Sequence, residues 1–150
     1  VDAGLTALSE MQDANGNFSS WDTCNAEGTA QVIMALCALG IDPATDPRFV
    51  KNGNSAIDGL MVFYNSQDGG FYHLKSEEGE GSSNNIATDQ SRDALIVYYR
   101  YLNGYNGLYD LSPEKDRSQN DLNEIIAAID SLPANPGLSD LDTYASVASK

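Results

Sequence analysis

Apolar residues recur at helical spacing along most of the chain, and the strongest run is residues 25–40, NAEGTAQVIMALCALG. Both sides of this run are largely apolar, which is typical of a helix buried on several sides. Its polar residues, Glu27, Thr29 and Gln31, gather in the first two turns. Because the first backbone N–H groups of a helix are unpaired and its dipole is positive there, we expect any binding or chemistry at this end.

Five weaker runs with the same spacing predict further helices. They cover residues 2–13, 55–64, 86–103, 118–132 and 139–150. Residues 42–54 contain two prolines and a glycine, so we expect a loop there. In the helix over 86–103, Leu102 is expected to face the core. The pattern as a whole predicts an all-α fold.

Two parts of the chain repeat one another, which indicates a duplicated structural unit. The shared residues are Gln12-x-x-x-Gly16-x-Phe18 and Asn65-x-x-x-Gly69-Gly70-Phe71 in the turns, and Thr29-x-Gln31-x-x-x-Ala35-Leu36 and Thr88-x-Gln90-x-x-x-Ala94-Leu95 in the helices that follow. Each unit is therefore predicted to be an outer helix, a glycine-aromatic turn and an inner helix. Glycine permits the tight reversal, and large apolar residues such as Phe18 and Trp21 are expected to be buried anchors.

With these residues, the chain resembles the repeat of the terpenoid cyclase and protein prenyltransferase superfamily, which also includes cobalamin-binding intrinsic factor and transcobalamin. The segment EGTAQVIMALCALGIDP is most similar to large surface or secreted proteins of Gram-positive bacteria. The resemblance implies a partial α/α toroid made of outer and inner helix pairs over residues 1–105. Residues 106–117 would then be a linker, and residues 118–150 a helical hairpin tail that could start another module.

Two hairpins are too few to close a toroid, and a short repeat array leaves an apolar end face uncovered. The chain also begins at Val1 inside a predicted helix, so we expect a fragment of a larger protein. We predict self-association through the exposed end of the array. The resemblance further implies an extracellular or cell-surface location.

The composition limits the partners that this surface can bind. The formal net charge is −14, from 22 acidic and 8 basic residues, which argues against nucleic acid and anionic membrane surfaces. No apolar run approaches the roughly 20 residues that span a bilayer, so no membrane insertion is predicted. A small molecule or a glycan remains as a candidate ligand.

A zinc site is one chemical hypothesis. Asp22, Cys24 and the single histidine, His73, are the residue types that hold zinc in the prenyltransferases that the chain resembles. In that family the ligands lie at the starts of inner helices, whereas these residues lie in the preceding turns. We therefore favour structural roles and predict no metal and no cofactor. Cys24 and Cys37 are expected to be two free thiols, because residues along one helix rarely meet disulfide geometry.

Acid–base chemistry is a second hypothesis. Glu27 and Asp89 both lie near the starts of predicted inner helices and would face one central cavity. The Asp-x-Asp-Asp acid motif of terpenoid cyclases is absent from the sequence, as are Gly-x-Ser-x-Gly and a second histidine. We therefore favour carboxylates that stabilise helix N-termini, and no catalytic residue is assigned.

Three functions follow from these observations. We favour a non-catalytic extracellular module used for structure, adhesion or ligand capture. The first alternative is a domain that binds a small cobalamin-like or isoprenoid-like molecule, and the second is the remnant of a cyclase-like or prenyltransferase-like enzyme. The candidate ligand-binding residues are Trp21, Glu27, Gln31, Tyr72, His73, Asp89 and Gln90.

Overall fold

The computed structural model describes residues 1–78 and 81–110. The chain divides into two units, Val1–Leu111 and Ser112–Lys150, and the fold described below belongs to the first. The predicted helices over 118–132 and 139–150, and with them the tail module, lie outside the described residues.

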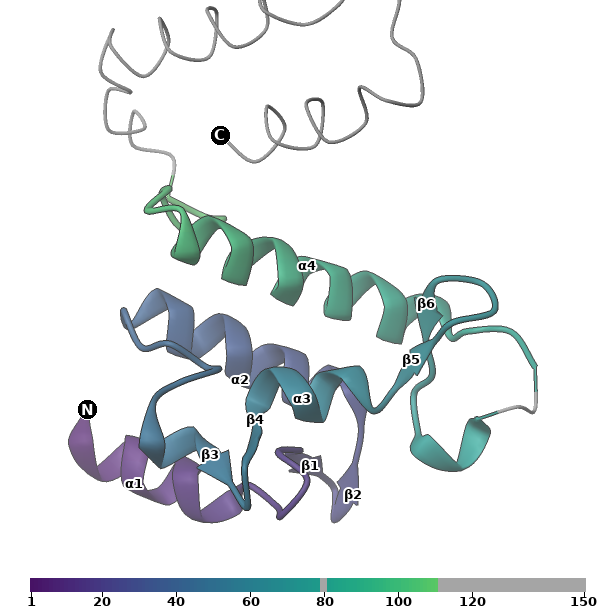
Figure 1. Ribbon diagram of the computed structural model, residues 1–150, viewed down its shortest axis with the longest axis horizontal. Helices are drawn as coiled ribbons and strands as arrows, with labels where there is room; N and C mark the ends of the chain where they lie inside the picture. The colour runs from purple at the N-terminus through teal and green to yellow at the C-terminus, as the bar shows by residue number, and fades with distance from the viewer. Residues whose placement is uncertain (79–80, 111–150) are drawn as a thin grey trace, which may run out of the picture. The chain divides into compact units, whose positions relative to one another are not determined.

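Within that part of the chain, the structure contains four α-helices, α1 (Asp2–Met11), α2 (Ala26–Ala38), α3 (Ala56–Met61) and α4 (Asn85–Leu102). Two short 3-10 helices, η1 (Pro47–Phe49) and η2 (Lys75–Glu77), lie in the connections. Helices α1, α2 and α3 fall inside stretches that the apolar spacing predicted to be helical, and α4 begins one residue before the predicted range of 86–103. In Figure 1, α2 and α4 run in the same direction, and α1 and α3 run the opposite way. Helix α2 packs against both α4 and α3.

The described residues also form three antiparallel strand pairs. They are β1 (Ser19–Ser20) with β2 (Thr23–Cys24), β3 (Val50–Lys51) with β4 (Asn54–Ser55), and β5 (Tyr64–Asn65) with β6 (Gly70–Phe71). The prediction of an all-α fold built as a partial α/α toroid is therefore wrong, because helices and small strand pairs alternate along the chain. Strands of two residues are too short to show an alternating apolar pattern, so the spacing analysis could not detect them.

The first two strand pairs close through tight two-residue turns. Trp21 and Asp22 have φ of 53° and 60°, and Asn52 and Gly53 have φ of 51° and 85°. Positive φ at both central residues matches the twist of paired strands, which is why Asn-Gly favours such turns. Residues 42–54, predicted to be a loop, therefore end in the β3–β4 hairpin.

Each of these hairpins leads directly into a helix. β2 is followed by Asn25, whose side-chain oxygen accepts a hydrogen bond of 2.7 Å from Gly28 N–H at the start of α2. In β4, Ser55 is itself the N-cap of α3 and forms a reciprocal capping box with Asp58. The hairpins thus fix where the helices begin: Ser55 is itself paired with Val50 in the strand pair, and the Asn25 side chain donates to Ser20 Oγ and Thr23 O of the β1–β2 hairpin.

The core of the first unit lies among α2, α3, α4 and the aromatic residues of the connections. Its fully buried large side chains include Ile33, Leu36, Phe49, Leu60 and Phe63, and Phe18 and Phe71 are 2% exposed. Two core predictions are wrong: Trp21 is 98% exposed, and Leu102 is 57% exposed. Trp21 occupies the tip of a two-residue turn, where the backbone directs the side chain into solvent.

A close backbone contact docks the first glycine-aromatic turn onto α3. A Cβ at Gly16, where φ is +88°, would lie 2.1 Å from the Ser55 carbonyl oxygen. A Cβ at Gly59 would lie 2.3 Å from the Gly16 carbonyl oxygen. Both positions therefore require glycine, because any side chain would separate the two backbones.

Two further predictions concern the membrane and the thiols. No helix in the described ranges has the length and apolar character needed to cross a bilayer. Cys24 and Cys37 are free thiols, as predicted, and Cys37 is buried.

Candidate functional site

The two repeated units form matching hydrogen bonds at the starts of α2 and α4. The Phe18 N–H donates to Thr29 Oγ1 at 3.1 Å, and the Phe71 N–H donates to Thr88 Oγ1 at 2.8 Å. In both repeats, a threonine in the first turns of the second helix thus accepts a hydrogen bond from the backbone of the aromatic residue. We call these second helices, α2 and α4, the inner helices. This equivalence explains why threonine recurs at the two positions.

A glutamine pair connects the two inner helices. Gln31 Nε2 on α2 donates to Gln90 Oε1 on α4 at 3.2 Å. The two residues occupy equivalent places in the repeat, and they meet because α2 and α4 lie side by side in the same direction (Figure 1).

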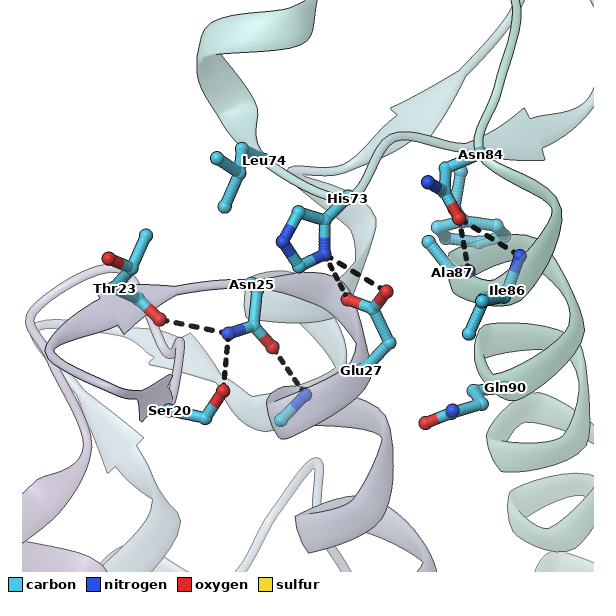
Figure 2. A network of polar contacts seen from close by, with 12 residues as sticks. Ser20, Thr23, Asn25, Glu27, His73, Leu74, Asn84, Ile86, Ala87 and Gln90 are labelled. Atoms are coloured by element: carbon cyan, nitrogen blue, oxygen red, sulfur yellow. Dashed lines mark hydrogen bonds and ion pairs between the residues drawn. The ribbon is translucent and has the colours of Figure 1, made fainter.

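Next to this pair, Glu27 and His73 form a carboxylate–imidazole contact (Figure 2). His73 Nδ1 lies 2.9 and 2.8 Å from the two carboxylate oxygens of Glu27. The His73 carbonyl oxygen also accepts a hydrogen bond of 3.2 Å from the Ala26 N–H. The backbone N–H groups of His73 and Leu74 donate to Glu77 Oε2 at 3.0 and 3.2 Å. The segment after β6 is therefore attached to the first turn of α2.

This contact orients the imidazole. The two carboxylate oxygens hold Nδ1, and in Figure 2 the other ring nitrogen, Nε2, points away from Glu27. In nucleophilic sites a carboxylate orients the histidine that acts as general base in the same way, and the histidine then contacts a hydroxyl or thiol. Among the described residues, however, no hydroxyl or thiol forms a hydrogen bond with His73. The pair therefore joins two segments of the fold, the first turn of α2 and the segment after β6.

The three zinc candidates have separate environments. The Cys24 thiol lies 3.1 Å from Ser19 Oγ and donates to Asp13 Oδ2 at 3.5 Å. Asp22 is exposed in the β1–β2 turn. His73 contacts Glu27 instead. Within residues 1–78 and 81–110, no three His, Cys, Asp or Glu side chains gather as a metal site would require.

The other candidate ligand-binding residues are dispersed. Trp21 projects into solvent, whereas Tyr72 is 4% exposed and its backbone N–H donates to Phe63 O at 2.9 Å. Asp89 is exposed on α4, and Glu27, its predicted acid–base partner, is bonded to His73. The structure thus brings together Glu27 with His73, and Gln31 with Gln90. A ligand-binding role for the seven residues stays a prediction.

A cavity of about 540 Å³ lies at the other end of the two inner helices. Its lining comes from the C-terminal turns of α2 and α4 and from the segment that follows α4. The cavity was not predicted from the sequence, because its helical residues have the spacing of ordinary core positions. One available signal was the density of tyrosines between residues 98 and 109, in YYRYLNGYNGLY.

Comparisons of the chain with protein-family models, curated proteins and solved structures find no match. The resemblance to the terpenoid cyclase and prenyltransferase superfamily therefore rests on the repeated residues alone and stays a prediction.

Proposed function

We propose that this chain is a non-catalytic module of a larger extracellular protein, and that it associates with a second copy through the outer face of α4, which carries Ile96, Tyr99 and Leu102. The resemblance to bacterial surface and secreted proteins supports the extracellular setting. The association is supported by a difference in burial: α2 packs against two helices, whereas one face of α4 is exposed.

The observation that carries the proposal is a loss of burial at equivalent positions of the two inner helices. Ala30, Ile33 and Cys37 on α2 are buried. The residues 59 positions later on α4 are Asp89, Arg92 and Ile96, and all three are exposed. Helix α2 has neighbours on two sides, α3 and α4, whereas the buried side of α4 is its inner one, with Ala87, Ser91, Ala94 and Val97.

The outer face of α4 is partly apolar. Ile96 is 48% exposed, Tyr99 is 60% exposed, and Leu102 is 57% exposed. These residues follow one another at three-residue intervals along the last turns of the helix, so their side chains form a continuous stripe. Exposed apolar residues that lie together mark surfaces for association.

Charge limits how strong this association can be. Each chain carries a formal net charge of −14, so two copies repel one another at low ionic strength. Salt screens this repulsion and leaves the contact between apolar side chains intact. We therefore expect a weak dimer whose stability increases with salt.

Analytical ultracentrifugation of the full chain over a range of concentrations tests the proposal. The unmodified chain should dimerise more tightly at high salt, and Ile96→Glu should weaken the dimer by about tenfold or more, equivalent to about 1.4 kcal/mol. Met11→Glu is the matched control, because Met11 is a 61% exposed apolar residue on α1. A chain that stays monomeric at all concentrations and salts would refute the proposal, and so would equal effects of the two substitutions.

A further inference from the structure

The geometry points to a binding site in the cavity between the C-terminal ends of α2 and α4, and we propose that it takes a small, uncharged, apolar molecule that contains a ring. None of the lining residues belongs to the outer face of α4, although the Tyr105 ring lies 6.3 Å from the Tyr99 ring, and the Glu27–His73 pair lies at the opposite helix ends.

The size and lining of the cavity match those of a small-molecule site. Its volume of about 540 Å³ falls within the range of roughly 300–1,000 Å³ that is typical of ligand pockets. The lining is mainly apolar and aromatic, and includes Met34, Ala38, Val97, Tyr101, Tyr105 and Leu108. Such surfaces favour apolar ligands because binding removes both partners from water.

The wall that follows α4 is held in place by several contacts. The chain reverses at Gly104, where φ is +66°, and Tyr105 N–H then donates to the Arg100 carbonyl oxygen at 2.9 Å. Arg100 Nε donates to the Asn106 carbonyl oxygen at 2.8 Å. The guanidinium of Arg100 also lies 5.6 Å from the centre of the Tyr105 ring. The cavity is therefore bounded by a tethered segment, which lowers the entropy lost when a ligand binds.

The charges around the cavity favour an uncharged ligand. The lining contains one carboxylate, Asp110, and no lysine or arginine. Burial, together with the nearby Asp42 carboxylate, raises the pKa of the Cys37 thiol to about 11, so this lining group is neutral at physiological pH. An anion would thus meet no positive lining group in a protein of net charge −14.

Organic cations are also disfavoured. They are commonly held between the faces of aromatic rings. Here the Tyr101 ring already stacks on Tyr98, with centroids 6.5 Å apart, and the Tyr105 ring already lies against Arg100. The Tyr101 and Tyr105 rings are therefore available mainly as apolar walls.

Two fluorescent probes that share one ring system test the site and its charge preference. N-phenyl-1-naphthylamine is uncharged, and 8-anilino-1-naphthalenesulfonate is the same molecule with an added sulfonate. Titrated into the full chain, the uncharged probe should saturate at one molecule per chain. The sulfonate should bind at least about tenfold more weakly.

Substitutions on two walls locate the bound probe. Ala38→Trp fills the cavity from α2, and Gly107→Trp fills it from the opposite wall, where no atom lies within 4 Å of a Cβ. Each should weaken binding of the uncharged probe by about tenfold. Ala35→Trp is the matched control, because Ala35 is exposed on the same helix but does not line the cavity, and binding should stay within about twofold of the unmodified chain.

The outcomes separate this proposal from the association through α4. Equal affinities for the two probes would overturn it, as would the absence of saturable binding or unchanged affinity in both Ala38→Trp and Gly107→Trp. Ile96→Glu leaves the lining of the cavity intact, so it should weaken the dimer without reducing probe binding. Either proposal can therefore fail without the other.

Discussion

The two inner helices begin alike but occupy different environments. Asn25 caps α2 and Asn84 caps α4, and the threonine four residues later accepts a backbone hydrogen bond in each. Beyond these first turns the helices differ, because α2 is buried by neighbours on two sides and α4 exposes its outer face. The repeated residues therefore determine the junction between turn and helix, whereas the residues between them determine what the helix packs against.

The connections leading into the two helices also differ. In the first repeat, the chain passes from Phe18 to the N-cap of α2 through one short hairpin, β1–β2. In the second repeat, the chain from Phe71 to Asn84, the N-cap of α4, is longer and contains η2. This additional segment carries His73 back to Glu27 on α2. The Glu27–His73 pair thus depends on the longer connection of the second repeat, which the first repeat lacks.

The largest expected effect tests the difference in burial. Ile33→Ala on α2 should lower the free energy of unfolding by about 3 kcal/mol, because it opens a cavity at a fully buried position. Arg92→Ala, at the equivalent place on α4, should change it by less than about 0.5 kcal/mol, because Arg92 is exposed. Urea denaturation followed by circular dichroism measures both. Similar losses would show that the outer face of α4 is covered after all.

A smaller effect tests the shared junction. Thr29→Val keeps the shape of the side chain but leaves the buried Phe18 N–H without its acceptor, which should cost about 2 kcal/mol. Thr88→Val removes the same contact to Phe71, but Thr88 is only half-buried, so water can replace part of the bond and about 1 kcal/mol should be lost. The same denaturation experiment applies. A larger loss for Thr88→Val than for Thr29→Val would contradict the argument that burial decides the size of the loss.

The smallest effect is the acid response of two carboxylates in the second repeat, Asp58 and Asp68. The hydroxyl and N–H of Ser55 lower the pKa of Asp58, and the hydroxyl and N–H of Ser83 lower the pKa of Asp68. A carboxyl whose pKa is lower in the folded state stabilises the fold above its ordinary pKa of about 4, and this contribution disappears as the pH falls through the folded value.

Backbone amide chemical shifts in an acid titration measure this response. The N–H groups of Ser55 and Ser83 donate to the two carboxylates and should shift as these become protonated. The Gly28 N–H is the control, because it donates to the neutral side chain of Asn25. If the Gly28 amide shifts at a higher pH than the amides of Ser55 and Ser83, the first repeat responds to acid before the second, and the prediction fails. Asp58→Asn should abolish the Ser55 response and leave that of Ser83.

Sequence reasoning located the helices of the described part better than it located the candidate site. Apolar spacing is a local property, so the buried helix around Ile33 and Leu36 was predictable. The β3–β4 hairpin was missed although Asn52-Gly53 is a strong turn signal, because the prolines nearby favoured a loop. Gln31 and Gln90 were both selected through the repeat. Their direct contact, however, depends on the parallel packing of α2 and α4.

The sequence by itself determined the positions of the helices in the described part, the recurrence of threonine and phenylalanine at the two junctions, and the acidic composition of the protein. These features depend on residues close together in the chain and on composition. Only the tertiary structure decided that Glu27 would meet His73, that Trp21 would face solvent, and that a cavity would open beside Cys37. Each of these outcomes depends on how segments distant in sequence approach one another, and side-chain spacing along a single helix carries no information about that approach.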